Sequence, residues 1–276
     1  MADGTVTSMP ELPEVETIRR QLEPRIVGRR LVDGDTHWSA KFVPARDAVG
    51  TTVEGLDRRG KYLIFALDDG NELVVHLGMT GSLAVWSEAV AALDDYVRAW
   101  WVLADGDVLV FRDVRRFGRI RVVPAGDYSS IATLAALGPE PLSDDFTADG
   151  LYEAVRASSR RVKTQLLSQR PVAGVGNIYA DEALWQARVH PGARRLTKSQ
   201  ARDLHAAIRA TLGSGLAHGG TTLRDYRDAD GGSGENQHHL VCYGRADEPC
   251  LRCGTALRSR VYDARTTTYC PDCQSR

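Results

Sequence analysis

Four of the five cysteines stand in two closely spaced pairs near the end of the chain, and this spacing could bind a metal. Two residues separate Cys250 from Cys253 and Cys270 from Cys273, and 16 residues lie between the pairs. Thiolates in two such pairs are the ligand set of a tetrahedral structural zinc site. Two disulfides are the alternative, but C-x2-C pairs are poorly placed to bridge each other in a reducing compartment. We therefore predict one structural zinc ion.

The segment between the cysteine pairs is rich in arginine and contains no lysine. Arg258, Arg260 and Arg265 lie in it, and guanidinium groups are well suited to phosphate. A segment this short could not fold without the metal. We expect a zinc-bound β-hairpin that presents arginine side chains.

Charge is distributed unevenly, although the formal net charge of the 276 residues is only −1. Residues 1–150 carry 16 Lys and Arg against 24 Asp and Glu, a net charge of −8, whereas residues 151–276 carry 19 against 12, a net charge of +7. A basic half indicates a phosphate-binding surface, but alone it is more often a solvated face. The composition, with 43% hydrophobic and 26% charged residues, excludes disordered and fibrous proteins.

The sequence carries no membrane or secretion signal. No apolar run approaches the roughly 20 residues that span a bilayer. Residues 1–10 have neither the basic region nor the apolar core of a secretion signal. We expect a soluble cytoplasmic protein that does not bind membranes.

The elements that would position reactive groups change in kind along the chain. Residues 10–24 predict an amphipathic helix, with acids near its positive N-terminal end and Val15, Ile18 and Leu22 at helical spacing. Residues 25–123 predict an antiparallel sandwich or barrel, because Asp-Gly turns recur between β-rich runs. Those runs are Lys61–Leu67 and Glu72–Leu77, then Arg98–Leu103 and Val108–Arg112.

The pattern becomes helical from Leu151, after a weakly patterned crossing over residues 124–150. Thr197 and Gln200 form a capping box that opens one of these helices. Gly213 is predicted to lie just past the end of that helix.

A glycine-bearing turn over Pro171–Asn177 leads into another helix near Ile178. Backbone amides at such a helix start can receive a phosphate, with Asn177 either capping the helix or adding a side-chain contact. A plain turn between two helices is the alternative.

Seven motifs follow one another in order from Met9 to the C-terminus. They are Met9–Glu16 (MPELPEVE), Arg59–Leu63 (RGKYL), His76–Gly81 (HLGMTG), Arg115–Gly118 (RRFG), Gly174–Ala180 (GVGNIYA), Gly219–Tyr226 (GGTTLRDY) and the four-cysteine hairpin. Together they resemble the formamidopyrimidine-DNA glycosylase (Fpg/MutM) family. The opening Pro-Glu-Leu-Pro resembles Fpg rather than its sister endonuclease VIII, whose opening typically reads Pro-Glu-Gly-Pro.

The resemblance implies an α+β fold. An N-terminal helix and antiparallel β-sandwich would form the catalytic domain over residues 10–135. A helical domain with a helix–two-turn–helix would span residues 136–235, and the four-cysteine zinc finger, a β-hairpin, would span residues 236–276. Residues 1–9 would be an N-terminal extension or the product of a mis-assigned start.

The resemblance also implies a bifunctional base-excision-repair enzyme. Such an enzyme removes oxidised purines, chiefly 8-oxoguanine and formamidopyrimidines opposite cytosine, and then nicks the abasic strand by β,δ-elimination. An N-terminal Pro10 would supply a secondary amine that attacks the sugar and forms an iminium directly. Glu11 would be the general acid/base and Lys61 the second catalytic cation. Without the resemblance, Pro10 and Glu11 would indicate only a good helix start.

The implied partner is damaged double-stranded DNA, bound by a monomer in the bacterial cytoplasm and at the nucleoid. A base inside a duplex must be extruded and its place filled. Met79 would fill that place, Arg115 would bond the orphaned cytosine and Phe117 would wedge the stack; a core position is the alternative for Met79 and Phe117. Phosphates would be held by Lys61, Asn177 and Arg265, and Arg224 would lie in the lesion-recognition loop or be a solvated charge.

The residues before Met9 bear directly on the activity. If they are retained, Pro10 is an internal amide without a free amine. Either the true start is Met9, or the extension is real and the protein is a catalytically altered or inactive Fpg-like, zinc-dependent damaged-DNA-binding protein. We prefer the start at Met9, because Glu11 and Lys61 are intact. An unrelated protein with a zinc ribbon is a third hypothesis.

Two further segments depart from the family pattern. Residues 234–237 lack the aromatic that usually precedes Gln in the loop before the zinc finger. Residues 94–98 lack a histidine that commonly contacts phosphate, which leaves Arg98 as the candidate substitute.

Overall fold

The computed structural model describes residues 9–87 and 94–275 and forms two compact units. Unit 1 contains the described residues up to Ala135 together with His218–Glu235, and unit 2 contains the remainder. Residues 218–235 therefore pack with the N-terminal unit, whereas we predicted them to belong to the helical domain. The other predicted domain boundaries stay predictions, and the first eight residues of the predicted extension lie outside the described part of the chain.

The predicted N-terminal helix is confirmed as α1 (Leu12–Ile26). Its apolar residues, among them Val15, Ile18 and Leu22, are no more than 1% exposed. They recur every three or four positions and so line one face of the helix. This face packs into the core of unit 1, which fixes the position of the residues just before the helix.

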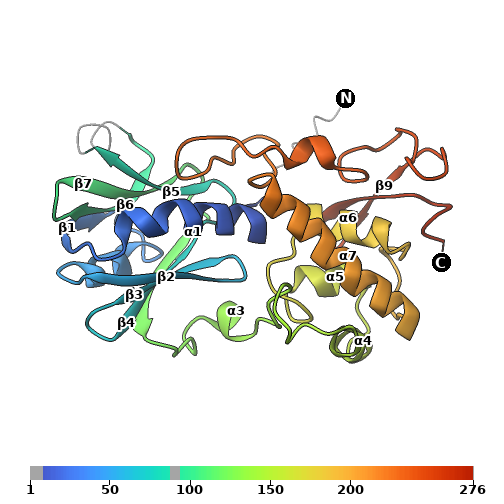
Figure 1. Cartoon of the computed structure of the whole chain (residues 1–276), viewed down its shortest axis with the longest axis horizontal. Coiled ribbons are helices and arrows are strands. Elements are labelled where there is room, and N and C mark those ends of the chain that lie inside the picture. Colours follow the sequence, from blue (N-terminus) through green and yellow to red (C-terminus); the bar gives the residue numbers. More distant parts are fainter. Residues whose placement is uncertain (1–8, 88–93, 276) are drawn as a thin grey trace. The chain divides into compact units, whose positions relative to one another are not determined.

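Within the described residues, unit 1 contains eight strands: β1 (Leu31–Thr36), β2 (Val53–Arg59), β3 (Tyr62–Leu67), β4 (Asn71–His76), β5 (Gly81–Ser87), β6 (Val97–Leu103), β7 (Asp107–Asp113) and β8 (Arg119–Pro124). They form two four-stranded antiparallel sheets, ordered β1-β6-β7-β5 and β2-β3-β4-β8 (Figure 1). Both predicted Asp-Gly hairpins occur, as β3–β4 and β6–β7. The predicted α+β fold is confirmed, with two separate sheets rather than a barrel.

The core of unit 1 lies between these sheets and α1, with Phe65, Trp101 and Phe111 almost fully buried. The indole Nε1 of Trp101 donates to Ala45 O at 2.8 Å, so this buried polar group is satisfied. Ala45 belongs to a 3-10 helix, η1 (Val43–Ala48), and the short helix α3 (Ala132–Ala135) ends the N-terminal segment of the unit.

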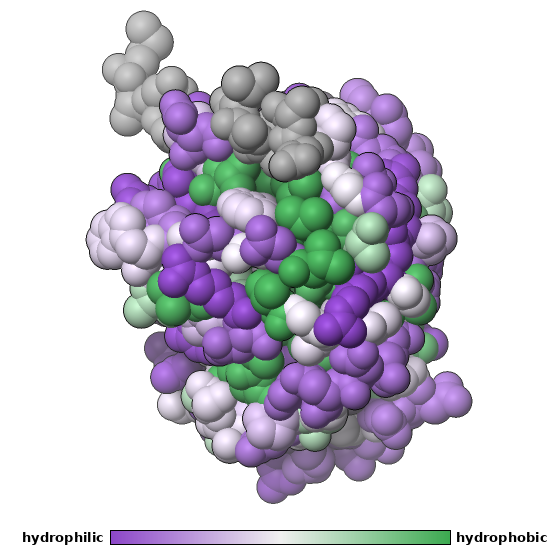
Figure 2. All heavy atoms as spheres, turned by 90° about the vertical axis from the view of Figure 1, so that its left-hand side faces the viewer, coloured by the Kyte–Doolittle hydropathy of each residue, from purple (hydrophilic) through white to green (hydrophobic). Residues whose placement is uncertain are grey.

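The surface of unit 1 mixes apolar and charged side chains. Seen from the left-hand side of Figure 1, apolar residues run across the middle of this face between hydrophilic ones (Figure 2). None of the helices within the described residues is long and apolar enough to cross a membrane.

Unit 2 contains helices and a small hairpin: α4 (Ala148–Arg156), α5 (Val162–Leu167), α6 (Asn177–Gln186), α7 (Lys198–Ala217), the 3-10 helix η2 (Asn236–His239), β9 (Arg258–Tyr262) and β10 (Arg265–Tyr269). Helix α6 packs against α5, α7 and β10. Its residues Ile178 to Leu184 are all buried, so it is the central helix of this unit.

Helix α7 begins as predicted but ends later than predicted. Thr197 N donates to Gln200 Oε1 at 2.9 Å and Gln200 N donates to Thr197 Oγ1 at 3.1 Å, which confirms the capping box. The helix then continues through Gly213 to Ala217, so the predicted end is wrong. Gly213 is not among the glycines with positive φ, whereas Gly219, with φ +67°, adopts the left-handed conformation that ends helices.

Candidate active site and zinc centre

Pro10 and Glu11 lie buried immediately before α1. Glu11 is the N-cap, with extended backbone (φ −102°, ψ −172°) and only 2% exposure. Its backbone N–H donates to Glu14 Oε2 at 2.8 Å, which satisfies a backbone group that the helix cannot pair. The first turn of α1 therefore fixes the position of both predicted catalytic residues.

Glu14 also binds a segment that lies far along the chain. Its Oε1 accepts from Thr221 N at 2.6 Å, and the Tyr226 hydroxyl donates to Glu14 O at 3.3 Å and to Gly219 O at 3.2 Å. The loop that carries Arg224 is thus fastened to the helix start that carries Pro10 and Glu11. Arg224 itself is exposed, with its Nε 3.7 Å from Asp225 Oδ1.

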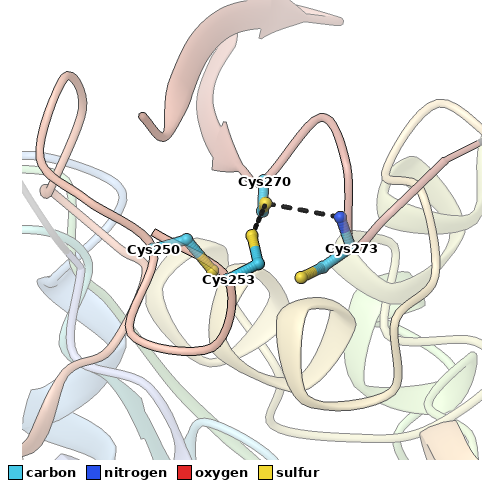
Figure 3. Close-up of side chains that lie close together, drawn as sticks. All are labelled: Cys250, Cys253, Cys270 and Cys273. Atoms are coloured by element: carbon cyan, nitrogen blue, oxygen red, sulfur yellow. Dashed lines mark hydrogen bonds between the residues drawn. The ribbon is translucent and has the colours of Figure 1, made fainter. Parts of the chain in front are cut away.

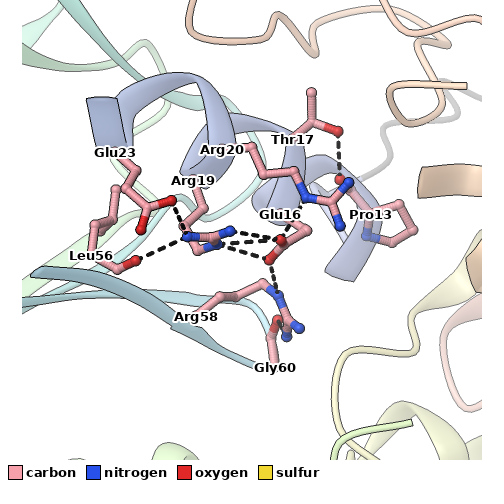
Figure 4. Close-up of polar contacts among 9 residues, drawn as sticks. All are labelled: Pro13, Glu16, Thr17, Arg19, Arg20, Glu23, Leu56, Arg58 and Gly60. Atoms are coloured by element: carbon pink, nitrogen blue, oxygen red, sulfur yellow. Dashed lines mark hydrogen bonds and ion pairs between the residues drawn. The ribbon is translucent and has the colours of Figure 1, made fainter. Parts of the chain in front are cut away.

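Lys61 is only 3% exposed and lies in the turn with Gly60, just before β3 rather than on the strand. Figure 4 shows how this turn is tied to α1. Arg58 Nε donates to Glu16 Oε2 at 3.0 Å, while Arg58 Nη1 donates to Gly60 O at 3.1 Å. One guanidinium therefore connects the helix with the residue that precedes Lys61.

Glu16 is the acceptor at the centre of this network. Burial alone would raise its pKa, but hydrogen bonds from Arg19, Arg20 and Arg58 hold the pKa of Glu16 below its usual value. The carboxylate is therefore ionised at neutral pH and can accept from all three guanidinium groups.

The charge of Lys61 acts on the side chain of His76. It pairs with Tyr62 across β3 and β4, with ring centroids 4.7 Å apart, and its Nδ1 accepts from Gly78 N at 3.1 Å. Burial of the ring and the charges of Lys61 and Arg119 lower the pKa of His76 from 6.5 to about 4. His76 is consequently neutral at physiological pH.

The structure brings together the three residues that we predicted to fill the duplex. Met79 lies half-buried in the turn after β4, whereas Arg115 and Phe117 are exposed in the turn after β7. The Arg115 guanidinium carbon lies 4.8 Å from the centroid of the Phe117 ring. A Cβ at Gly78 (φ +69°) would come within 2.6 Å of the backbone of Phe117, so these two turns touch.

Asp113 fixes the turn that carries Arg115 and Phe117. Its Oδ2 accepts from Gly118 N at 2.7 Å and its Oδ1 accepts from Thr80 Oγ1 at 2.5 Å. Thr80 in turn accepts from Arg115 N at 3.1 Å. The buried carboxylate of Asp113 thus joins the turn after β4, which carries Thr80, to the turn after β7, which carries Arg115 and Phe117.

Arg98, the candidate substitute for a missing histidine, is a buried side chain. It is 8% exposed, and its guanidinium donates to the carbonyl oxygens of Asp113 at 2.8 Å and Asp95 at 3.0 Å. Its guanidinium thus bonds the backbone of β7 and of the turn before β6.

In unit 2, the structure places Asn177 beside the start of β10. Asn177 is the first residue of α6, whose N-cap is Gly176. The Asn177 side chain does not cap the helix but donates from Nδ2 to Thr266 O at 3.1 Å. It therefore lies next to the exposed Arg265, and these two predicted phosphate contacts share one surface.

The four predicted zinc ligands converge. Their sulfur atoms all lie within 4.8 Å of one another, and Cys253 Sγ is 3.5 Å from Cys270 Sγ (Figure 3). Zn–S bonds of about 2.3 Å in a tetrahedron place sulfurs about 3.8 Å apart, so the group fits zinc. The first pair precedes β9 and the second follows β10, as predicted.

The fifth cysteine, Cys242, is a buried thiol outside this group. It is 0% exposed and donates to Thr268 O at 3.2 Å. Burial raises the pKa of Cys242 well above the usual value of a thiol, so it stays protonated and takes a packing role.

Two acids of α6, which sequence reasoning missed, attach the zinc finger to the helices. Glu182 accepts backbone N–H groups from Val241, Cys242 and Tyr243 at 3.0, 2.8 and 2.7 Å. Asp181 accepts from Thr268 N at 2.9 Å and pairs with the buried Lys163 at 2.6 Å. Two adjacent acids between the apolar residues of this helix were the one signal in the sequence that could have revealed them.

Comparison with known proteins covers nearly the whole chain. Residues 9–120 match the Formamidopyrimidine-DNA glycosylase N-terminal domain, residues 137–227 its H2TH domain, and residues 247–276 the zinc finger found in FPG and IleRS. The Formamidopyrimidine-DNA glycosylase of Deinococcus radiodurans is 45% identical over 282 residues, covering 96% of this chain and 97% of the relative.

Solved structures show the same likeness. The MutM (FPG) protein of Thermus thermophilus has a TM-score of 0.89 at 45% identity, covering 97% of this chain and 99% of its own. The Lactococcus lactis Fpg in complex with DNA that contains an abasic site has a TM-score of 0.88 at 35% identity, covering 96% and 100%.

The fold, the zinc finger and these matches together define a DNA glycosylase of base excision repair that carries one structural zinc ion. The chain belongs to the formamidopyrimidine-DNA glycosylase family. The hypothesis of an unrelated zinc-ribbon protein is therefore wrong, and a catalytically inactive homologue is not favoured.

Proposed function

We propose that this glycosylase removes oxidised purines, namely 8-oxoguanine and formamidopyrimidines, from double-stranded DNA and then cleaves the strand. The observation that carries the proposal is the buried Pro10–Glu11 pair, fixed by Glu14 at the start of α1 within the segment that matches the family. We also propose that the protein acts as a monomer in the bacterial cytoplasm, at the nucleoid when it is bound to DNA.

The chemistry requires Pro10 to be the first residue of the active protein. Its nitrogen is then a secondary amine with a free electron pair, and a start at Met9 followed by removal of Met9 would expose it. The nitrogen attacks the sugar C1′, and the damaged base leaves with the bonding electron pair and takes up a proton. Opening of the sugar ring then yields an iminium.

The iminium serves as the electron sink for strand cleavage. Loss of a proton from C2′ expels the 3′ phosphate, a second elimination expels the 5′ phosphate, and water releases the sugar remnant from Pro10. Glu11 gives and takes protons during ring opening, and Lys61 supplies a positive charge near the reacting centre.

The DNA contacts divide into those that fill the duplex and those that hold its backbone. Met79, Arg115 and Phe117 take the place of the extruded nucleotide. Phosphates are held by Lys61, Asn177 and Arg265, which set the register without reading sequence. Arg224 contacts the extruded base from the loop fastened to α1.

Borohydride trapping tests this proposal. Protein that begins at Pro10 is mixed with a duplex containing 8-oxoguanine opposite cytosine, and peptide mass analysis locates the adduct. We expect a covalent adduct at Pro10, and Glu11→Gln should abolish base excision while leaving DNA affinity intact. Protein that retains residues 1–9 is the matched control and should give no adduct.

Three outcomes would contradict the proposal. An adduct at a lysine would remove Pro10 from its role, and normal excision by Glu11→Gln would remove Glu11. Tight lesion binding with neither an adduct nor strand cleavage, in protein that begins at Pro10, would support the alternative of an inactive damaged-DNA-binding protein.

A further inference from the structure

Trp38 is the most exposed large hydrophobic side chain in the described part of the protein. It is 80% exposed, and it follows β1 in the segment 37–42. Exposing an indole to water forgoes the burial of a large apolar surface, and tryptophan at such a position is typical of a binding contact rather than of a scaffold.

The backbone on both sides of Trp38 is held firmly in place. His37 N donates to Arg98 O at 2.8 Å, and the buried Phe42 ring packs against Phe111, with centroids 5.8 Å apart. The ring of His37 lies 5.0 Å from that of Trp38. The indole is therefore presented by an ordered segment, so little conformational entropy would be lost on binding.

The segment lies directly beside the turn that carries Arg115 and Phe117. Lys41 Nζ donates to Arg116 O at 2.8 Å, and Ile120 N donates to Lys41 O at 2.9 Å. Arg121 Nη1 donates to Ala40 O at 3.2 Å. The surface around Trp38 is thus continuous with the turn that we propose to enter the duplex.

The charge of this surface is positive. Lys41, Arg116 and Arg121 supply three cations. The nearby His37 has a pKa below its usual value, because its ring is partly buried and lies near the charges of Arg98 and Arg116. The nearby acids are engaged elsewhere, because Asp35 pairs with Arg46 at 2.5 Å and Asp113 accepts hydrogen bonds inside the turn. An exposed aromatic among cations suits a polyanion with flat apolar groups.

We propose that Trp38, with Lys41 and Arg116, forms an additional DNA contact that grips the duplex flanking the lesion. The contact rests on the proposed function, since it extends the turn of Arg115 and Phe117. The indole ring packs on a sugar or an exposed base face and its N–H donates to a phosphate, while the two cations face neighbouring phosphates.

Binding to a duplex with a central tetrahydrofuran lesion, at fixed salt, tests the contact. Trp38→Ala should weaken affinity about 5-fold or more, and Trp38→Phe should restore most of it because the ring is retained. Val32→Ala is the matched control, as Val32 is a 47% exposed apolar residue of the same unit, and it should leave affinity unchanged. Trp38→Ala should unfold at the same temperature as the wild type, since the side chain is largely exposed.

Two further measurements identify the flanking duplex as the partner. Shortening the duplex from one end should abolish the difference between the wild type and Trp38→Ala, whereas shortening it from the other end should not. In the free protein, acrylamide should quench a component of the tryptophan emission that comes from Trp38. The duplex should protect this component from quenching, and Trp38→Phe should lack it.

The outcomes separate this inference from the proposed function. If protein that begins at Pro10 is trapped on and cuts the 8-oxoguanine duplex, while Trp38→Ala binds every tetrahydrofuran duplex as tightly as the wild type, the Trp38 contact alone is overturned. Equal losses on all duplex lengths, or an indole that stays accessible in the complex, also overturn it. If protein that begins at Pro10 neither binds nor cuts the 8-oxoguanine duplex, the proposed function is overturned instead.

Discussion

At the scale of single residues, burial and charged neighbours set the protonation state of His76. His76 has a pKa of about 4 because its ring is buried and lies near the charges of Lys61 and Arg119. A neutral Nδ1 can accept the Gly78 N–H, and this bond fixes the backbone immediately before Met79. Protonation of His76 would remove the acceptor.

We predict that His76 lowers the free energy of unfolding as the pH falls below about 6.5. In the unfolded chain the histidine has its ordinary pKa of about 6.5, so between pH 6.5 and 4 the unfolded state binds a proton that the folded state does not. The contribution of His76 to the free energy of unfolding should therefore fall by about 2–3 kcal/mol as the pH drops from 7 to 4.5.

Urea unfolding of wild type and His76→Gln at the two pH values measures this effect. Subtracting one protein from the other cancels losses common to both, including release of zinc. The chain has seven histidines, so the signal of His76 is identified as the one that is missing from His76→Gln. If this signal titrates near pH 6.5 in the NMR spectrum of the folded wild type, the prediction is contradicted.

The sequence was informative about residues whose roles follow from local pattern or motif. The four cysteines were predicted from spacing alone, and Pro10, Glu11 and Lys61 from motifs. Glu14, Asp113 and Glu182 were missed, because each is an ordinary acid until the fold brings a distant donor to it. The donors are backbone N–H groups for Glu14 and Glu182 and the Thr80 hydroxyl for Asp113.

At the scale of elements, a single guanidinium joins α1 to the turn between β2 and β3. Arg58 and Glu16 are both only 12% exposed, whereas Arg20, which also bonds Glu16, is 59% exposed. Arg58 reaches two acceptors at once, Glu16 Oε2 and Gly60 O. A lysine, with one ammonium group, cannot reproduce this fork.

We predict that Arg58→Lys destabilises the protein by about 1–3 kcal/mol and slows single-turnover base excision about 10-fold, because Lys61 follows the displaced turn. The matched control is Arg20→Lys, which changes an exposed member of the same network and should cost less than about 0.5 kcal/mol. Denaturant unfolding and rapid-quench kinetics provide the measurements. Similar effects of the two substitutions would refute a positioning role for Arg58.

Elements with strong local signals were predictable and their ends were less so. The Asp-Gly turns identified two hairpins, and the capping box identified the start of α7. The end of α7 was misplaced because Gly213 resembles a helix terminator, while the left-handed Gly219 lies further on. The packing of residues 218–235 with unit 1 depends on Glu14 and Gln21 of α1, a long-range contact without a local pattern.

At the scale of the whole molecule, the two units keep separate cores, and only one of them depends on metal. The core of unit 1 contains the sheets and α1. In unit 2, a small cluster of Trp185, Cys242, Leu257 and two zinc ligands underlies the hairpin. This cluster is too small to hold the hairpin by apolar burial alone, so its order follows from the zinc.

We predict that removing zinc abolishes binding to lesion duplexes while the β-sheets of unit 1 stay folded. Without the metal the hairpin loses its anchor, and Arg265 leaves the surface that it shares with Asn177. Cys253→Ala should therefore lose both zinc and duplex affinity, whereas Cys242→Ala, a substitution of the one cysteine outside the metal group, should retain one zinc per chain and near-normal affinity. Native mass spectrometry counts the metal, and circular dichroism follows the sheets. If metal-free protein still binds the lesion duplex tightly, DNA binding does not depend on the zinc finger and the prediction is contradicted.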